Sequence, residues 1–161
     1  MRSTLIFLLL LCGWITSFAQ PAQTPTPETS ERFWIGVSTG FPLGPGIYIG
    51  LSDVLGRVDL RANTSLFLGG GIDLGVDALI DLPVVITPLP AIVYAGLGPT
   101  FTVAAEDSGF ALQAFLGTEV RLGAEGNQPG GVFLEVGPTV ELVPATDAGF
   151  LARAGFNYHF K

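Results

Sequence analysis

Charged residues are scarce in this chain. Only 13% of its 161 residues are Asp, Glu, Lys or Arg, against about 25% in a typical soluble domain. Seven basic residues stand against fourteen acidic ones, and the single lysine is Lys161. No cationic surface is predicted, so nucleic-acid binding is excluded. Because 48% of the residues are hydrophobic, the chain does not have the composition of a disordered acidic protein either.

Residues that commonly carry chemistry are nearly missing. Cys12 is the only cysteine and His159 the only histidine, so neither a zinc cluster nor a Cys–His catalytic pair is expected. The glycine clusters at 44–46 and 69–71 lack the Lys-Ser/Thr sequence and the helix of a phosphate loop. We therefore expect no enzymatic activity, no cofactor and no metal site.

The first 19 residues have the three parts of a secretory signal peptide. Arg2 gives the positive charge, residues 5–11 form the apolar core, and Ser17-Phe18-Ala19 predicts cleavage before Gln20. Cys12 directly follows this apolar core and is preceded by a leucine, which argues against a lipoprotein signal.

The segment after the predicted cleavage site differs in composition from the rest of the chain. Residues 20–31 are rich in Pro, Thr and Glu and show no apolar periodicity, which is typical of a flexible leader. Residues 32–161 are then expected to form one domain.

Apolar residues recur at every second position from residue 33 onward, which is the pattern of β-strands. Eight strands are expected, separated by turn signals at 42–46, 53–56, 69–71, 83–90, 106–109, 124–131 and 144–149. One face of these strands is almost entirely Ile, Leu, Val, Ala and Phe. The other face holds glycines and nearly all of the strand charges.

A strand set that is apolar on one face and both glycine-rich and charged on the other is typical of a barrel that faces lipid. The pattern predicts an all-β, antiparallel, up-and-down, eight-stranded transmembrane β-barrel, whose narrow interior holds side chains only. The predicted interior charge network comprises Arg57, Asp59, Arg61, Asp73, Asp77, Asp81, Glu119, Arg121, Glu135, Glu141 and Arg153.

The third and fourth strands allow a specific pairing to be predicted. Keeping their apolar faces aligned across Gly69–Gly71 pairs Leu66 with Leu74 and Ala62 with Ala78. Asn63 then lies opposite Asp77, and Asp59 lies opposite Asp81. Because facing carboxylates repel, Arg57 and Arg61 are expected to hold them in place.

Aromatic residues are expected to gather at the two rims of the barrel. Phe41, Phe101, Phe110 and Phe150 fall at one rim of an up-and-down meander, and Phe33, Phe156, Tyr158 and Phe160 fall at the other. Two such girdles are typical of membrane barrels.

The last strand alternates apolar residues and ends on aromatics, with Phe150, Phe156, Tyr158 and Phe160 among them. With these features, residues 32–161 resemble the small eight-stranded outer-membrane β-barrel proteins of bacteria. The resemblance implies outer-membrane lipid and the barrel-assembly machinery as partners, with the C-terminal aromatics as the assembly signal. It further implies a structural, envelope-maintaining role without an open pore. Lys161 departs from the pattern, since it makes the last aromatic penultimate.

Three alternatives remain open at this stage. A secreted soluble barrel of lipocalin type would bind an apolar ligand inside, and a surface adhesin would need long outer loops. A membrane helix over residues 82–105 would be interrupted by four prolines.

Loop length is a second departure from the resemblance. In such proteins the longer loops are expected on the outer side of the membrane, away from the chain termini. Here the longer loops, 83–90 and 124–131, fall on the side of the termini.

Overall fold

The computed structural model describes residues 33–67, 70–84, 86, 90–104, 108–122, 129–144 and 146–160. The predicted signal peptide and leader, together with Arg32 and Lys161, lie outside these residues. The described chain contains eight strands: β1 (Phe33–Phe41), β2 (Leu43–Leu51), β3 (Val58–Phe67), β4 (Gly71–Leu82), β5 (Ala91–Val103), β6 (Ser108–Arg121), β7 (Gly130–Val143) and β8 (Asp147–Phe160).

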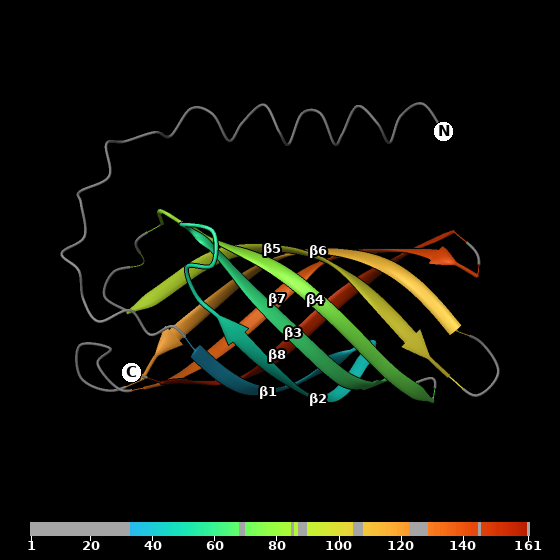
Figure 1. Ribbon diagram of the computed structural model, residues 1–161, viewed down its shortest axis with the longest axis horizontal. Helices are drawn as coiled ribbons and strands as arrows, with labels where there is room; N and C mark the ends of the chain where they lie inside the picture. Colours follow the sequence, from blue (N-terminus) through green and yellow to red (C-terminus); the bar gives the residue numbers. More distant parts are fainter. Residues whose placement is uncertain are drawn as a thin grey trace, which may run out of the picture.

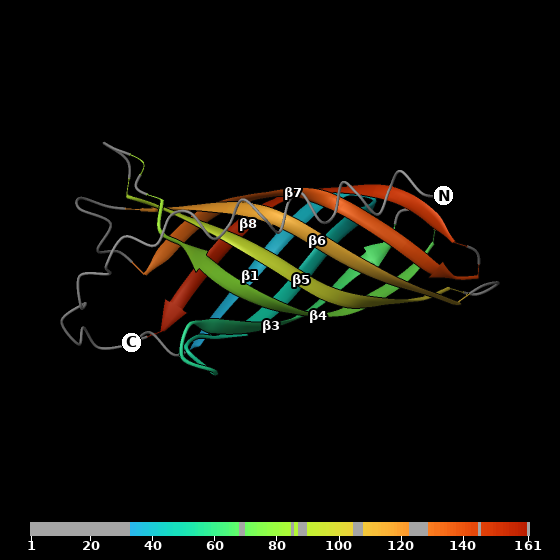
Figure 2. The same ribbon diagram turned by 90° about the horizontal axis from the view of Figure 1, so that it is seen from above.

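The strands form a closed barrel in which every strand pairs with its neighbours in sequence (Figure 1). All pairings are antiparallel, and β1 closes the barrel against β8 from Phe33↔Phe160 to Phe41↔Ala152. The strands are strongly tilted relative to the long axis of the barrel, as a second view shows (Figure 2). The predicted all-β, eight-stranded, up-and-down antiparallel barrel is confirmed.

No helix within the described part of the chain has both the length and the apolar character needed to cross a membrane.

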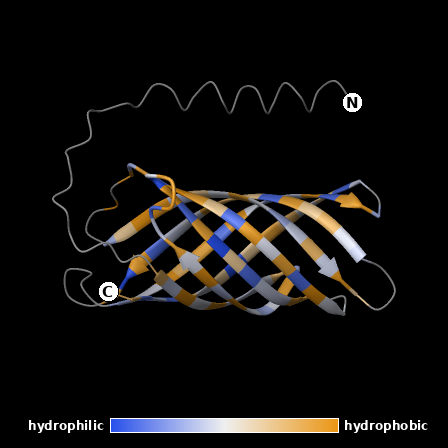
Figure 3. Cartoon of the chain, viewed as in Figure 1, coloured by the Kyte–Doolittle hydropathy of each residue, from blue (hydrophilic) through white to orange (hydrophobic). Residues whose placement is uncertain are grey.

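The two faces of the wall follow the predicted alternation. Apolar and polar residues alternate along the strands (Figure 3), and the apolar ones point outward. Val37 is 54% exposed, Ile47 61% and Leu97 60%, whereas the intervening residues point inward. Because a closed eight-stranded barrel has room inside only for side chains, these inward residues form the packed interior.

The aromatic residues lie at the two ends of the wall where they were expected. Phe33 and Phe160 begin β1 and end β8, with their ring centroids 5.2 Å apart. At the other end, Phe101 and Phe110 flank the turn between β5 and β6, with ring centroids 4.8 Å apart. The barrel thus has an aromatic group at each rim.

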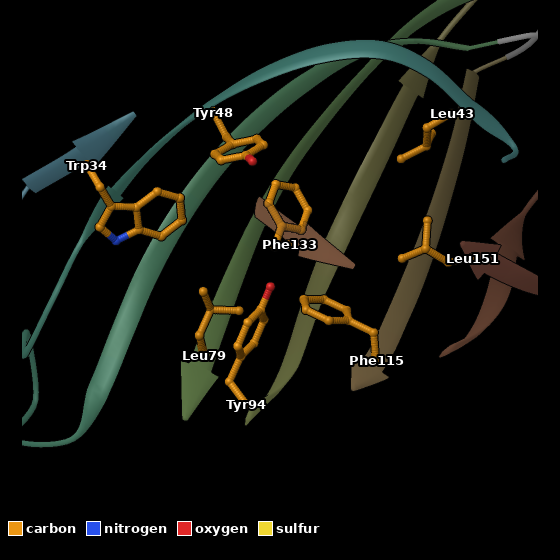
Figure 4. Close-up of a cluster of buried hydrophobic side chains, with 8 residues drawn as sticks. All are labelled: Trp34, Leu43, Tyr48, Leu79, Tyr94, Phe115, Phe133 and Leu151. Atoms are coloured by element: carbon orange, nitrogen blue, oxygen red, sulfur yellow. The ribbon is translucent and has the colours of Figure 1, made fainter. Parts of the chain in front are cut away.

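The hydrophobic part of the interior is small and mostly aromatic (Figure 4). It consists of Trp34, Leu43, Tyr48, Leu79, Tyr94, Phe115, Phe133 and Leu151. Each of the five aromatic rings lies beside a glycine on the paired strand: Trp34 beside Gly50, Tyr48 beside Gly36, Tyr94 beside Gly117, Phe115 beside Gly96 and Phe133 beside Gly155. A Cβ on Gly50 would lie 1.9 Å from Trp34 Cε2. The glycines therefore provide the space that the rings occupy.

The pairing of β3 with β4 corrects the predicted register. Phe67 pairs with Gly71, and three residues separate them. Arg61 consequently lies directly opposite Asp77, and Ala62 pairs with Val76 rather than Ala78. The prediction was wrong by two residues because it assumed a wider turn, whereas Gly70, with a φ of 91°, allows a tight one.

Several of the turns are shorter than the sequence indicated. β2 begins at Leu43, so the predicted turn at 42–46 is largely strand, with a register shift between Leu43 and Gly46 against β3. β6, β7 and β8 likewise begin before the end of their predicted turns. β4 and β6 end, and β5 and β7 begin, at the end of the barrel that carries Phe33 and Phe160.

Candidate functional site

Four ionic side chains meet in the middle of the barrel. Arg61 from β3, Asp77 from β4, Glu135 from β7 and Arg153 from β8 are each 6% exposed or less. Arg61 donates from Nη2 to Asp77 Oδ2 at 2.8 Å and from Nη1 to Glu135 Oε1 at 2.6 Å. Arg153 donates from Nε to Glu135, and its Nη2 atom lies 3.4 Å from Asp77 Oδ2. Two cations and two anions thus compensate one another in what we call the ionic centre.

Neutral side chains complete the hydrogen bonding of the two carboxylates. Gln113 Nε2 donates to Asp77 Oδ1 at 2.6 Å, and Asn63 Nδ2 donates to Asp77 Oδ2 at 3.0 Å. The Tyr94 hydroxyl donates to Glu135 Oε1 at 2.7 Å. Buried charges are tolerated when they are paired and their remaining hydrogen-bonding positions are filled, and both conditions are met here.

Aromatic rings cover the guanidinium groups of the ionic centre. The Cζ atom of Arg61 lies 5.4 Å from the ring centre of Tyr48 and 5.1 Å from that of Phe115, and Arg153 Cζ lies 4.7 Å from Phe115. These distances are within the range of cation–π attraction. Phe115 therefore contacts both cations and fixes them relative to each other.

A second polar group lies nearer the end that carries Phe33 and Phe160. Glu119 is its centre: Asn157 Nδ2 donates to Glu119, and His159 Nε2 lies 2.9 Å from Glu119 Oε1. Arg121 Nε is also 2.9 Å from Glu119 Oε1. This group lines a cavity of about 150 Å³, and Asp59 and Asp81 line the same cavity.

The predicted network residues fall into four sets. The structure brings Arg61, Asp77, Glu135 and Arg153 together in the ionic centre, and it joins Glu119 to Arg121. Asp73 is buried but separate. The remaining residues lie toward the rims: Asp59 is half-buried, whereas Arg57, Asp81 and Glu141 are exposed.

The predicted interior position of Arg57 is wrong. β3 begins at Val58, so Arg57 belongs to the connection from β2, and the alternation of β3 does not apply to it. The partners of Asp59 differ from the prediction as well. Asp59 lies opposite Leu79, not Asp81, and accepts a hydrogen bond from the Asp53 backbone N–H at 2.9 Å.

Sequence reasoning missed the neutral partners of the buried charges. Tyr94, Gln113, Asn157 and His159 alternate with outward-facing apolar residues, but nothing in a single strand indicates which carboxylate each one meets. Each of their contacts joins two strands that have one other strand between them, so it does not follow from the pairing of neighbouring strands. The available signal was their position: each is a hydrogen-bonding side chain on a face otherwise made of glycine, aromatic and charged residues.

In the ionic centre the charged side chains compensate one another and neutral donors complete their hydrogen bonding. Within the described residues, no three His, Cys, Asp or Glu side chains are arranged to hold a metal ion. Comparison of the chain with protein-family models, with curated proteins and with solved structures finds no match. Functional inference therefore depends on the physical character of the barrel.

Proposed function

We propose that this chain is an integral β-barrel protein of the bacterial outer membrane with a structural, envelope-maintaining role. The observation that carries the proposal is the polarity of the barrel wall. Its outer face is apolar, and its interior contains the buried Arg61–Asp77 and Arg153–Glu135 ion pairs. A water-soluble barrel instead has an apolar interior and a polar outer face.

The outer apolar surface runs around the whole barrel. Each strand contributes exposed large apolar side chains, among them Val37, Ile47, Leu66, Val76, Leu97, Leu116, Leu134 and Phe156. Soluble monomers rarely expose a contiguous apolar patch of more than a few hundred Å². An apolar belt between two aromatic rims instead suits a bilayer, with the aromatic rings at its two interfaces.

The interior argues against the soluble ligand-binding alternative. A barrel that binds an apolar molecule needs an apolar cavity, commonly of about 300–1,000 Å³. Two cavities that described residues line inside the barrel have volumes of about 150 and 110 Å³, and the ionic centre lies in the middle of the barrel. An apolar ligand in the middle of this barrel would displace paired charges.

The ionic centre also supports a structural role over a transport role. Arg61, Arg153, Asp77 and Glu135 reach one another from β3, β8, β4 and β7, so their side chains cross the lumen. A barrel filled in this way offers no continuous water path for a solute. Insertion by the barrel-assembly machinery, with the aromatic end of β8 as the signal, belongs to the same proposal.

Fractionation tests the proposed location. The full chain, expressed in a Gram-negative host, is expected in the outer-membrane fraction, resistant to urea washing and released by detergent. Its gel mobility is expected to change on heating, because folded barrels migrate differently from unfolded ones. A matched chain starting at Gln20 is expected to remain in the cytoplasm. Recovery of the full chain as a folded monomer in detergent-free periplasmic extract contradicts the proposal.

Permeability tests the proposed role. A deletion strain of the source bacterium is expected to become more sensitive to detergents and large hydrophobic antibiotics, and the wild-type gene is expected to restore resistance. Unchanged sensitivity, with the protein located in the outer membrane, rejects the envelope-maintaining role and leaves the location intact.

A further inference from the structure

The barrel end that carries Phe101 and Phe110 contains a second cavity. Its volume is about 110 Å³, and its wall is divided in character. Asp73, Thr100 and Thr102 make up part of the polar side, and Leu43, Phe67 and Leu151 part of the apolar side. The cavity is thus both anionic and hydrophobic.

Asp73 is a buried carboxylate without a charged partner. It is 1% exposed, and its one hydrogen bond is from the Thr102 hydroxyl to Oδ1. Its Oδ2 atom has no partner. By contrast Asp77, on the same strand and face, receives hydrogen bonds from Arg61, Asn63 and Gln113. Among the described residues no Arg, Lys or His side chain lines the cavity beside Asp73.

Two hydroxyl groups near Asp73 are also unpartnered. Thr100 Oγ1 and Ser65 Oγ have no hydrogen bond, although the residues are only 8% and 7% exposed. Ser65 is directly opposite Asp73, and Thr100 is opposite Gly75, two residues further along β4. Asp73 and Thr100 line the cavity, so two unsatisfied oxygen atoms from adjacent strands face it, whereas Ser65 lies outside its lining. Buried polar groups in folded proteins nearly always have partners, so this set indicates a missing one.

The rim of this end of the barrel is acidic as well. Glu141 lines the cavity, and its partner across the strands is Asp147. Two facing carboxylates raise the negative potential at the entrance. The field at this end therefore attracts cations toward Asp73.

We propose that this cavity binds a primary ammonium ion that carries a short apolar chain. An ammonium group has one positive charge and three hydrogen-bond donors. It compensates Asp73 and donates to the unsatisfied oxygen atoms, while its chain packs against Leu43, Phe67 and Leu151. A divalent metal ion is a poorer match, because calcium and magnesium favour oxygen ligands or water on all sides. The site does not depend on whether the barrel lies in a membrane.

Calorimetric titration of the purified full-length protein with n-butylammonium chloride tests the proposal. Saturable binding is expected, and 1-butanol, which has the same chain without the charge, is expected not to bind. Asp73→Asn is expected to weaken binding about tenfold or more, since charge-assisted hydrogen bonds are the strong ones. Thr100→Val, with nearly the same shape, is expected to weaken it about twofold to tenfold. Asp81→Asn, at the other end of the barrel, is the matched control and is expected to bind as the wild type does.

A second readout covers the case in which a variant does not fold. Butylammonium is expected to raise the unfolding temperature of the wild-type protein, and 1-butanol is not. Absence of both saturable binding and thermal stabilisation overturns the proposal, and so does binding that Asp73→Asn leaves unchanged. Calcium binding that requires Asp73 and that butylammonium does not displace also overturns it, in favour of a metal site.

Discussion

Phe115 occupies the space beside Gly96. The two residues lie opposite each other on β6 and β5, and a Cβ on Gly96 would lie 2.1 Å from Phe115 Cζ. The same ring contacts the guanidinium groups of Arg61 and Arg153. Any group added at Gly96 must therefore displace a ring that supports the ionic centre.

Gly96→Ala is expected to lower the free energy of unfolding by about 1–3 kcal/mol, the usual cost of overpacking. Urea titration of the detergent-folded protein measures it. Gly109→Ala is the matched control, because its Cβ would lie no closer than 3.3 Å to Glu141 Oε1. Combining Gly96→Ala with Phe115→Leu is expected to recover part of the loss. Equal destabilisation by Gly96→Ala and Gly109→Ala contradicts the packing account.

Arg61→Met is expected to destabilise the barrel by about 3–5 kcal/mol, because it leaves Asp77 and Glu135 buried with incomplete compensation. Arg57→Met removes the same charge from an exposed position and is expected to change stability by less than about 0.5 kcal/mol. Urea midpoints of the two variants give the comparison. If both variants unfold at the wild-type urea concentration, the ionic centre does not contribute to stability.

Charge on the outer face tests lipid contact directly. Ala154→Arg, in the middle of β8, is expected to cost about 2–4 kcal/mol in a bilayer, and Tyr158→Arg, near the rim, less. Both side chains are exposed in the structure, so in water each arginine would be tolerated. Folding yield and stability in lipid vesicles provide the measurement. Wild-type behaviour of Ala154→Arg in vesicles is incompatible with a lipid-facing wall.

Planar bilayer recordings of the pure wild-type protein are expected to show no stable ion conductance. The reason is steric and electrostatic, since the paired side chains of Arg61, Arg153, Asp77 and Glu135 fill the lumen. Channel recordings with an established porin serve as the positive control. Reproducible openings that persist through repurification would show that the lumen conducts.

Deletion of residues 160–161 is expected to impair delivery to the outer membrane while leaving folding into detergent largely intact. Phe160 then acts as part of an assembly signal, beyond its ring contacts with Phe33 and Tyr158. Deletion of Lys161 alone is the control and is expected to leave delivery unchanged. Delivery and folding are followed by fractionation and by heat-dependent gel mobility. Loss of detergent folding to the same degree as delivery would mean that Phe160 is needed for stability alone.

Alternation with period two determined which face each strand residue occupies, but it could not determine register. A shift of two residues returns every side chain to its own face, so the predicted and observed pairings of β3 with β4 look equally good in sequence. The turn decides between them. The tight turn at Gly70 places Arg61 opposite Asp77, which makes one half of the ionic centre.

The link between the two halves of the centre lay beyond any local pattern. Glu135 pairs with Arg153 on the adjacent strand, as Arg61 pairs with Asp77. The contacts that join these two pairs form only because strands from opposite sides of the closed barrel face each other. The exposure of residues near the rims could not be predicted from the sequence either. The alternation of β7 continues through Glu141, yet this residue is exposed. Sequence reasoning therefore identified the members of the interior more reliably than their depth or partners.

The five ring-on-glycine pairs have a consequence for the order of assembly. Every pair lies within one hairpin: two in β1–β2, two in β5–β6 and one in β7–β8. The β3–β4 hairpin carries Arg61 opposite Asp77 instead. Each hairpin thus holds an inner contact that requires no other part of the chain, and contacts close in sequence form fastest. Arg61 and Glu135 are 74 residues apart, and Arg153 and Asp77 are 76 apart. These long-range bonds form as the cylinder closes, so the last contacts made are those that join its opposite walls.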